Sequence, residues 1–209
     1  MSHDRLLRWL HRLAVHSGLV RLVNFYTAGL HAESKLQGGS RVLFRIRHSS
    51  WYPLLVAGLA VVSAGTSLYP FGPVIVAATV FAPNRWRGVI IGSALGATVG
   101  ATAFVLLVHN LGLGLVDGLF PQLRLSSVWE YSAYWIAEHG SPALGAIAAL
   151  PVPQMPALIL AALSDMGVVN IALALLVGKA IKYTVYVLGV LLVLRSIRHV
   201  AEWQERAAN

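Results

Sequence analysis

Two lysines, Lys179 and Lys182, lie near the middle of an apolar run that extends from residue 168 to residue 194. Residues three or four apart share one face of a helix, so Tyr183 and Tyr186 would lie beside them. An unpaired ammonium at the bilayer centre costs roughly 2.5–3.5 kcal/mol, so each lysine needs a cavity or a partner. Two such cations would suit a phosphate group. The alternative is structural, with both ammonium groups bonded to backbone carbonyls or reaching toward the membrane surface.

A further polar residue, Gln154, lies between Pro153 and Pro156, in the apolar segment that precedes this run. Its amide would bind a polar ligand or satisfy backbone groups that the prolines leave without hydrogen bonds. A half-helix that starts near Pro156 would also direct N-terminal amide groups at an anion. Asp165 would pair with a lysine or, as is more usual for a Ser-Asp pair at a turn, cap the next helix.

The sequence gives little support to enzyme or metal chemistry. Ser93 and His109 are sixteen residues apart in one expected helix, about 24 Å, and cannot pair as nucleophile and base. No H-x-x-x-H, carboxylate cluster or phosphate-loop pattern occurs. The chain has no cysteine, and its eight histidines are scattered. We therefore expect no enzyme activity, no metal and no cofactor.

The composition is that of an integral membrane protein: 209 residues, 57% hydrophobic and only 11% charged. Eight of the sixteen Lys and Arg residues fall in residues 1–50. Such a basic flank usually marks the cytoplasmic side and attracts anionic lipids, which are the expected partners. Nucleic-acid binding is disfavoured because the basic residues alternate with Leu, Val and Trp. A homo-oligomer is compatible with the sequence.

Amphipathic segments are expected at the membrane surface. Residues 4–24 have helical spacing of leucines and arginines, which predicts a helix lying on the cytoplasmic leaflet or, equally, one packed on the protein's own surface. Residues 31–50 read as a basic loop. Residues 112–138 are expected to form an exposed interfacial connection that includes a helix capped by Ser126 or Ser127.

Two apolar segments, residues 51–82 and 141–166, are each interrupted by prolines. Half-length apolar segments separated by helix breakers predict hairpins that enter a membrane, turn and leave again. The prolines of these breaks are Pro70, Pro73, Pro151, Pro153 and Pro156.

Each broken segment is followed by a full-length apolar helix, expected at residues 88–111 and 168–194. The second would span about 40 Å, enough to cross a bilayer with tilt. The first carries Gly92, Gly96 and Gly100, a ridge of small residues that would let a neighbouring helix approach closely.

The two halves form a weak internal repeat. Each contains P-x-x-P, a short apolar run and an asparagine, Asn84 or Asn170, followed eight residues later by Gly92 or Gly178. If the second half is inverted relative to the first, thirteen of the sixteen Lys and Arg residues are cytoplasmic, and only Arg124 is outside. Inverted repeats of this kind are typical of transporters.

The pattern H-G-x(10)-P-x(26)-G, formed by His139, Gly140, Pro151 and Gly178, resembles the second half of the DedA family. This family is also called the VTT or SNARE-associated Golgi-protein-like family. The Pro-Phe-Gly-Pro stretch at 70–73 is similar to its first proline motif. The resemblance covers about residues 51–195 and implies transbilayer movement of lipid carriers such as undecaprenyl phosphate, together with dependence on the proton gradient.

The chain departs from the better-studied branch of that family at its charged positions. Membrane acids of that branch are replaced by Ser63, Ile75 and Ala101, and two arginines by Ala148 and Gln154. If those acids carry proton coupling in the family, this chain lacks them. Lipid handling remains an expectation.

We therefore expect an all-α integral membrane protein with two inverted re-entrant helical hairpins, each followed by a transmembrane helix. Residues 1–50 would be a basic cytoplasmic region, 51–195 the membrane domain and 196–209 a short cytoplasmic tail, in the bacterial cytoplasmic membrane. The expected function is a DedA-type transporter or flippase for an anionic, phosphate-bearing lipid. Its site would consist of Lys179, Lys182, Gln154, Tyr183 and Tyr186. The alternative is a non-transporting scaffold or lipid-binding protein.

Overall fold

The computed structural model describes residues 49, 51–66, 69–120 and 122–208. These belong to the second of the two units into which the chain divides, Ser49–Asn209. The helix expected at residues 4–24 and almost all of the basic loop expected at 31–50 lie outside the described residues.

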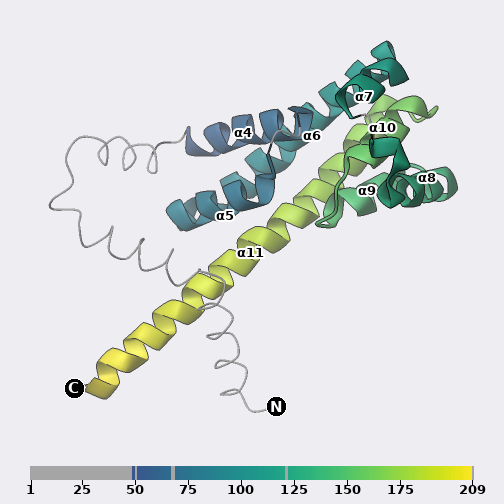
Figure 1. Ribbon diagram of the computed structural model, residues 1–209. Helices are drawn as coiled ribbons and strands as arrows, with labels where there is room; N and C mark the ends of the chain where they lie inside the picture. Colours follow the sequence, from purple (N-terminus) through teal and green to yellow (C-terminus); the bar gives the residue numbers. More distant parts are fainter. Residues whose placement is uncertain (1–48, 50, 67–68, 121, 209) are drawn as a thin grey trace. The chain divides into compact units, whose positions relative to one another are not determined.

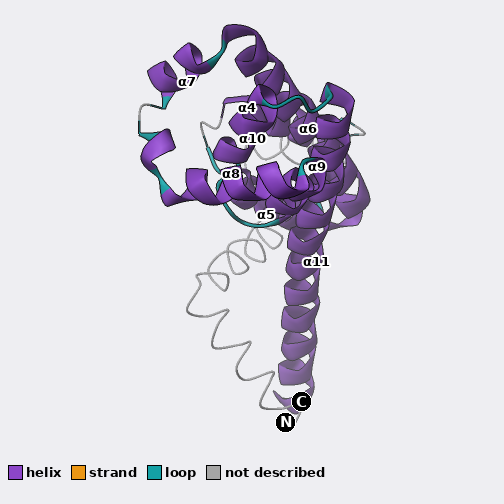
Figure 2. Cartoon of the chain, turned by 90° about the vertical axis from the view of Figure 1, so that its right-hand side faces the viewer, coloured by secondary structure: helices purple, strands orange, loops and turns teal. Residues whose placement is uncertain are grey.

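The described part of the chain is all-helical and contains no strand, as the sequence predicted (Figures 1 and 2). Its elements are α4 (Tyr52–Thr66), α5 (Phe71–Phe81), η2 (Pro83–Arg85), α6 (Trp86–Leu111), α7 (Leu113–Leu119), η3 (Leu123–Leu125), α8 (Ser127–His139), α9 (Ser141–Ala149), α10 (Met155–Leu163) and α11 (Val168–Ala208).

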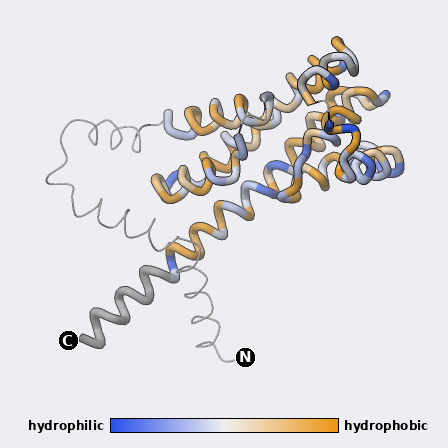
Figure 3. Tube along the Cα trace, viewed as in Figure 1, coloured by the Kyte–Doolittle hydropathy of each residue, from blue (hydrophilic) through white to orange (hydrophobic). Residues whose placement is uncertain are grey.

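Two helices are long and apolar enough to cross a membrane, judged by length and composition. They are Pro83–Leu111, which is η2 with α6, and Val168–Ser196 within α11. Both were expected from their apolar runs. Figure 3 shows that apolar residues predominate along these two stretches and along α4 and α5.

The helix breaks fall at the prolines. Pro70 has extended backbone and immediately precedes α5, and the break between α9 and α10 spans residues 150–154. Proline forces the preceding residue out of helical geometry and cannot donate a backbone hydrogen bond, but it is tolerated in a first helical turn. Pro156 accordingly lies in the first turn of α10. The re-entrant course of these segments stays a prediction.

Glycines in α6 bring α4 into close backbone contact. A Cβ at Gly92 would lie 2.8 Å from the carbonyl oxygen of Pro53, and one at Gly96 or Gly100 would overlap the backbone of the next turns of α4. The predicted ridge therefore does pack against a neighbouring helix. Because the contacts advance in the same direction along both helices, α4 and α6 are parallel.

The second half repeats this arrangement. A Cβ at Gly178 of α11 would overlap the carbonyl of Gly145 in α9 and lie 2.8 Å from the Cβ of Ala148. Thus α9 and α11 also form a parallel pair, as α4 and α6 do. Figure 1 shows the long helices α6 and α11 running in opposite directions.

The connection between the halves contains the expected α8, capped by Ser126, whose Oγ accepts a hydrogen bond from the Trp129 N–H at 3.3 Å. The short α7 was not predicted, because its glycines disfavour a helix. Gly112 and Gly140 follow α6 and α8 with φ of 69° and 58°, a positive φ that glycine adopts without strain.

One boundary differs from expectation. The apolar run ends at Leu194, but α11 continues to Ala208, so the expected tail of 196–209 is helical almost to its end. This stretch contains no glycine or proline, and charged helix-forming residues continue a helix even where an apolar run stops.

Candidate functional site

Lys179 is the most deeply buried charged residue of the described chain, with only 2% of its surface exposed. It lies on α11 opposite the break between α9 and α10. Its Nζ donates a hydrogen bond to Oε1 of Gln154 at 3.2 Å. The structure thus brings together two residues that the sequence assigned to one site.

Lys182 lies one turn further along α11 and is partly buried. Its Nζ donates to the backbone carbonyl of Leu150 at 2.7 Å. Leu150 is the C-cap of α9, and the break that follows leaves carbonyls near this end without the usual intrahelical donors. The lysine therefore satisfies a group that the break exposes.

No carboxylate accompanies these two cations among the described residues. The ion pair found in the described chain, between Arg124 and Asp117 at 3.4 Å, lies in the connection between the halves. Asp165 is exposed and forms neither an ion pair with a lysine nor a helix cap; instead, the Ser164 Oγ accepts from the Met166 N–H at 3.4 Å. The cap predicted for Asp165 is thus wrong, and the two ammonium groups face only neutral acceptors.

The first half of the chain reaches the same part of α11. Tyr183 is buried, and its ring centroid lies 5.4 Å from that of Phe71, the first residue of α5. A Cβ at Gly72 would lie 3.4 Å from the Tyr186 ring. Both helix breaks therefore converge on residues 179–186 of α11.

Two groups that contact the candidate site were not predicted from the sequence: the Phe71 ring and the Leu150 carbonyl. Phe71 directly follows Pro70, so a residue at the start of a helix beside a break was the available signal for it. The carbonyl of Leu150 is a backbone group, so the residue type at this position does not indicate that it accepts a hydrogen bond from a lysine. The N-terminus of α10, which was expected to add donors for an anion, begins at Met155, and Gln154 makes no side-chain cap there.

Four positions where the expected resemblance would place acids or an arginine are buried in this chain. Ile75, Ala101 and Ala148 are at most 1% exposed. Ser63 is buried too, and its Oγ donates to the Tyr69 carbonyl at 2.8 Å in the first break. The structure therefore has small or apolar side chains buried at these positions.

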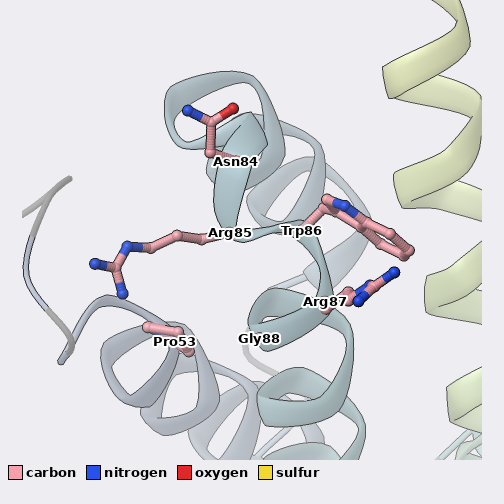
Figure 4. A pocket seen from close by; sticks show the side chains of 6 residues that line it. All are labelled: Pro53, Asn84, Arg85, Trp86, Arg87 and Gly88. Atoms are coloured by element: carbon pink, nitrogen blue, oxygen red, sulfur yellow. The ribbon is translucent and has the colours of Figure 1, made fainter.

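Two surface hollows lie away from the lysine ammonium groups. A groove of about 430 Å³ runs between α9 and α11 and includes Gly178 and Ile181, the residues that immediately precede the two lysines. A cleft of about 310 Å³ lies at the start of α6 and is lined by Pro53 and Asn84–Gly88 (Figure 4).

Comparison with known proteins identifies no relative: no family model, no curated protein and no solved structure matches the chain.

Proposed function

We propose that the chain is a DedA-like membrane protein with two re-entrant hairpins, α4–α5 and α9–α10, in the bacterial cytoplasmic membrane. The lengths of the short helices support this course. Helices α9 and α10 have nine residues each, about 14 Å, which is half of a hydrocarbon core of roughly 30 Å. The arginine distribution supports cytoplasmic termini by the positive-inside rule.

The function that the site supports best is transport of an anionic, phosphate-bearing lipid such as undecaprenyl phosphate across the bilayer. The observation that carries this proposal is the pair Lys179 and Lys182, which lack a carboxylate partner in the described chain. Two ammonium groups in an apolar bundle are costly unless an anion neutralises them. A phosphate group would supply that charge.

The two lysine ammonium groups have N–H donors that no acceptor in the described chain uses. Each ammonium has three N–H donors, whereas one bond to Gln154 and one to Leu150 account for a single donor on each lysine. A phosphate would accept from the remaining donors without displacing either protein contact. Tyr183 and Tyr186 would form the wall of this site on α11.

A second function is favoured by the same contacts. Lys179 and Lys182 both connect α11 to the α9–α10 break, so they would serve a non-transporting scaffold equally well. The buried Ile75 and Ala101, where the family branch has acids, also favour a protein without proton-coupled transport.

Reconstituted vesicles separate the two functions. Movement of a fluorescent polyprenyl phosphate between leaflets would be compared for the intact chain, Lys179→Ala/Lys182→Ala and empty vesicles. Arg195→Gln is the matched control, because it removes an exposed positive charge from the same helix. Transport predicts movement that is lost only in the lysine variant. Equal movement in all samples would refute the transport proposal and leave the scaffold.

A further inference from the structure

The cleft at the start of α6 is a second candidate site, built from different residues. It lies where the first turn of α4 meets η2 and α6, and Pro53 and Asn84–Gly88 line it. Figure 4 shows Arg85 and Arg87 extending from this turn in opposite directions, with Pro53 beneath Arg85. Arg87 therefore contributes a positive charge to the lining of the cleft.

Arg87 is exposed, and its guanidinium carbon lies 5.1 Å from the centroid of the Trp86 ring. No carboxylate in the described part of the chain forms an ion pair with it. Trp86 starts a helix that is apolar enough to cross a membrane. Tryptophan and arginine at the end of such a helix are placed at the level of lipid headgroups.

An apolar strip continues from this cleft along the pair α4 and α6. The glycine contacts place Pro53 opposite Gly88 and Gly92. The residues in contact are Pro53, Ala57 and Val61 on α4 and the four glycines from Gly88 to Gly100 on α6. Each residue of a helix is rotated by about 100° from the one before it, and the two helices are parallel. Residues that follow a contact residue on α4 therefore lie on the same side of the helix pair as residues that precede a contact glycine on α6. Arg87 precedes Gly88 and therefore belongs to this side. Its apolar members, all exposed, are Leu54, Val62, Ile91, Leu95 and Val99.

We propose that the cleft binds the phosphate headgroup of an anionic glycerophospholipid such as phosphatidylglycerol, whose acyl chains lie along this strip. The charge of Arg87 complements the phosphate, and bidentate hydrogen bonding from guanidinium suits its oxygens. The exposed strip favours a lipid over free phosphate, because only a lipid covers the apolar side chains next to the headgroup. The site does not use Lys179 or Lys182.

The test uses the full chain in phosphatidylcholine vesicles that contain a small fraction of spin-labelled phosphatidylglycerol. The quantity measured is the association constant of motionally restricted label, relative to spin-labelled phosphatidylcholine. Arg87→Gln should lower this constant about fivefold, the effect of one basic residue near a membrane surface, whereas Arg87→Lys should keep most of it. Arg195→Gln is the control, since Arg195 is exposed at the end of the other apolar span.

Three results would overturn the proposal: no change in Arg87→Gln, an equal loss in Arg195→Gln, or displacement of the label by millimolar inorganic phosphate. The lysine variant Lys179→Ala/Lys182→Ala should keep the Arg87-dependent component. If this variant no longer moves polyprenyl phosphate but keeps the Arg87-dependent lipid association, the cleft and the lysine site are separate. If the variant also loses the Arg87-dependent association, the cleft is not an independent site.

Discussion

The two halves of the described unit share one helix order but differ in the contact between the short helix and the long one. In the first half, four glycines of α6, at positions 88, 92, 96 and 100, lie against continuous α4. In the second half, Gly178 lies against α9, and lysines follow it at 179 and 182. The repeat places these lysines at the positions of Ser93 and Gly96.

The length of the short helix explains the difference. Helix α4 has 15 residues, whereas α9 has nine and ends beside Lys182. Carbonyls inside α4 are bonded within the helix, so a lysine facing them would find no acceptor. The early end of α9 frees the carbonyl of Leu150 and places Gln154 within reach. The break after α9 therefore supplies the hydrogen-bond acceptors that allow Lys179 and Lys182 to lie in the second half.

The largest expected effect is at the glycine ridge. Gly96→Ala would place a Cβ in the backbone of Ala57, so α4 and α6 must separate, and the free energy of unfolding should fall by about 3 kcal/mol. Unfolding in mixed micelles with increasing SDS would measure it. Gly58→Ala on the facing helix is the control, because its Cβ meets nothing within 4 Å. Equal stability of the two variants would contradict the ridge contact.

A smaller loss is expected at the corresponding glycine of the second half. Gly178→Ala also meets backbone, that of Gly145, but α9 is short and has breaks at both ends, so it can shift. We expect about 2 kcal/mol by the same titration, with Gly189→Ala as the control because its Cβ has open space. A loss greater than that of Gly96→Ala would show that α9 is held as rigidly as α4.

The next effect concerns the pair Lys179 and Gln154. Gln154→Leu leaves a buried ammonium without this acceptor and should cost about 1–3 kcal/mol. Lys179→Met with Gln154→Leu should recover much of that loss, because neither polar group then lacks its partner. The four proteins of this double-mutant cycle would be compared by SDS unfolding. Additive losses would mean that the two side chains are not coupled.

The smallest effect separates two buried serines of the first half. The Ser63 Oγ bonds to the Tyr69 carbonyl, so Ser63→Ala should cost about 1 kcal/mol. The Ser93 Oγ is buried with no hydrogen-bond partner in the described chain, so Ser93→Ala should be neutral or slightly stabilising. Thermal unfolding monitored by intrinsic fluorescence would measure both. Equal losses would show that Ser93 does have a partner.

The positions of the helices were largely predictable, because their signals are local. Prolines marked both breaks and apolar runs marked both long helices. Ser126 or Ser127 was predicted to start α8, and the structure has Ser126 as its cap. The far end of α11 was not predictable in this way. Arginines at positions 195 and 198 indicated where the apolar run ends, but charge does not stop a helix, and no glycine or proline follows.

The candidate site was predictable only in part. Two lysines in an apolar run and Gln154 between prolines were chemically conspicuous, and the structure places Gln154 against Lys179. Two other contacts, Lys182 with the Leu150 carbonyl and Tyr183 with Phe71, depend on tertiary packing across 32 and more than a hundred residues. Contacts between residues so far apart in the sequence cannot be predicted from the spacing or the types of the residues.

The unbroken course of α11 has a mechanical consequence. From Lys179 to Ala208 the chain is one continuous helix, about 44 Å long at roughly 1.5 Å per residue. A change in tilt of about 10° at the lysines would therefore displace the far end by about 8 Å, because a helix without a break acts as a lever arm. If an anion binds between the lysines as proposed and changes this tilt, the position of Ala208 would report its binding.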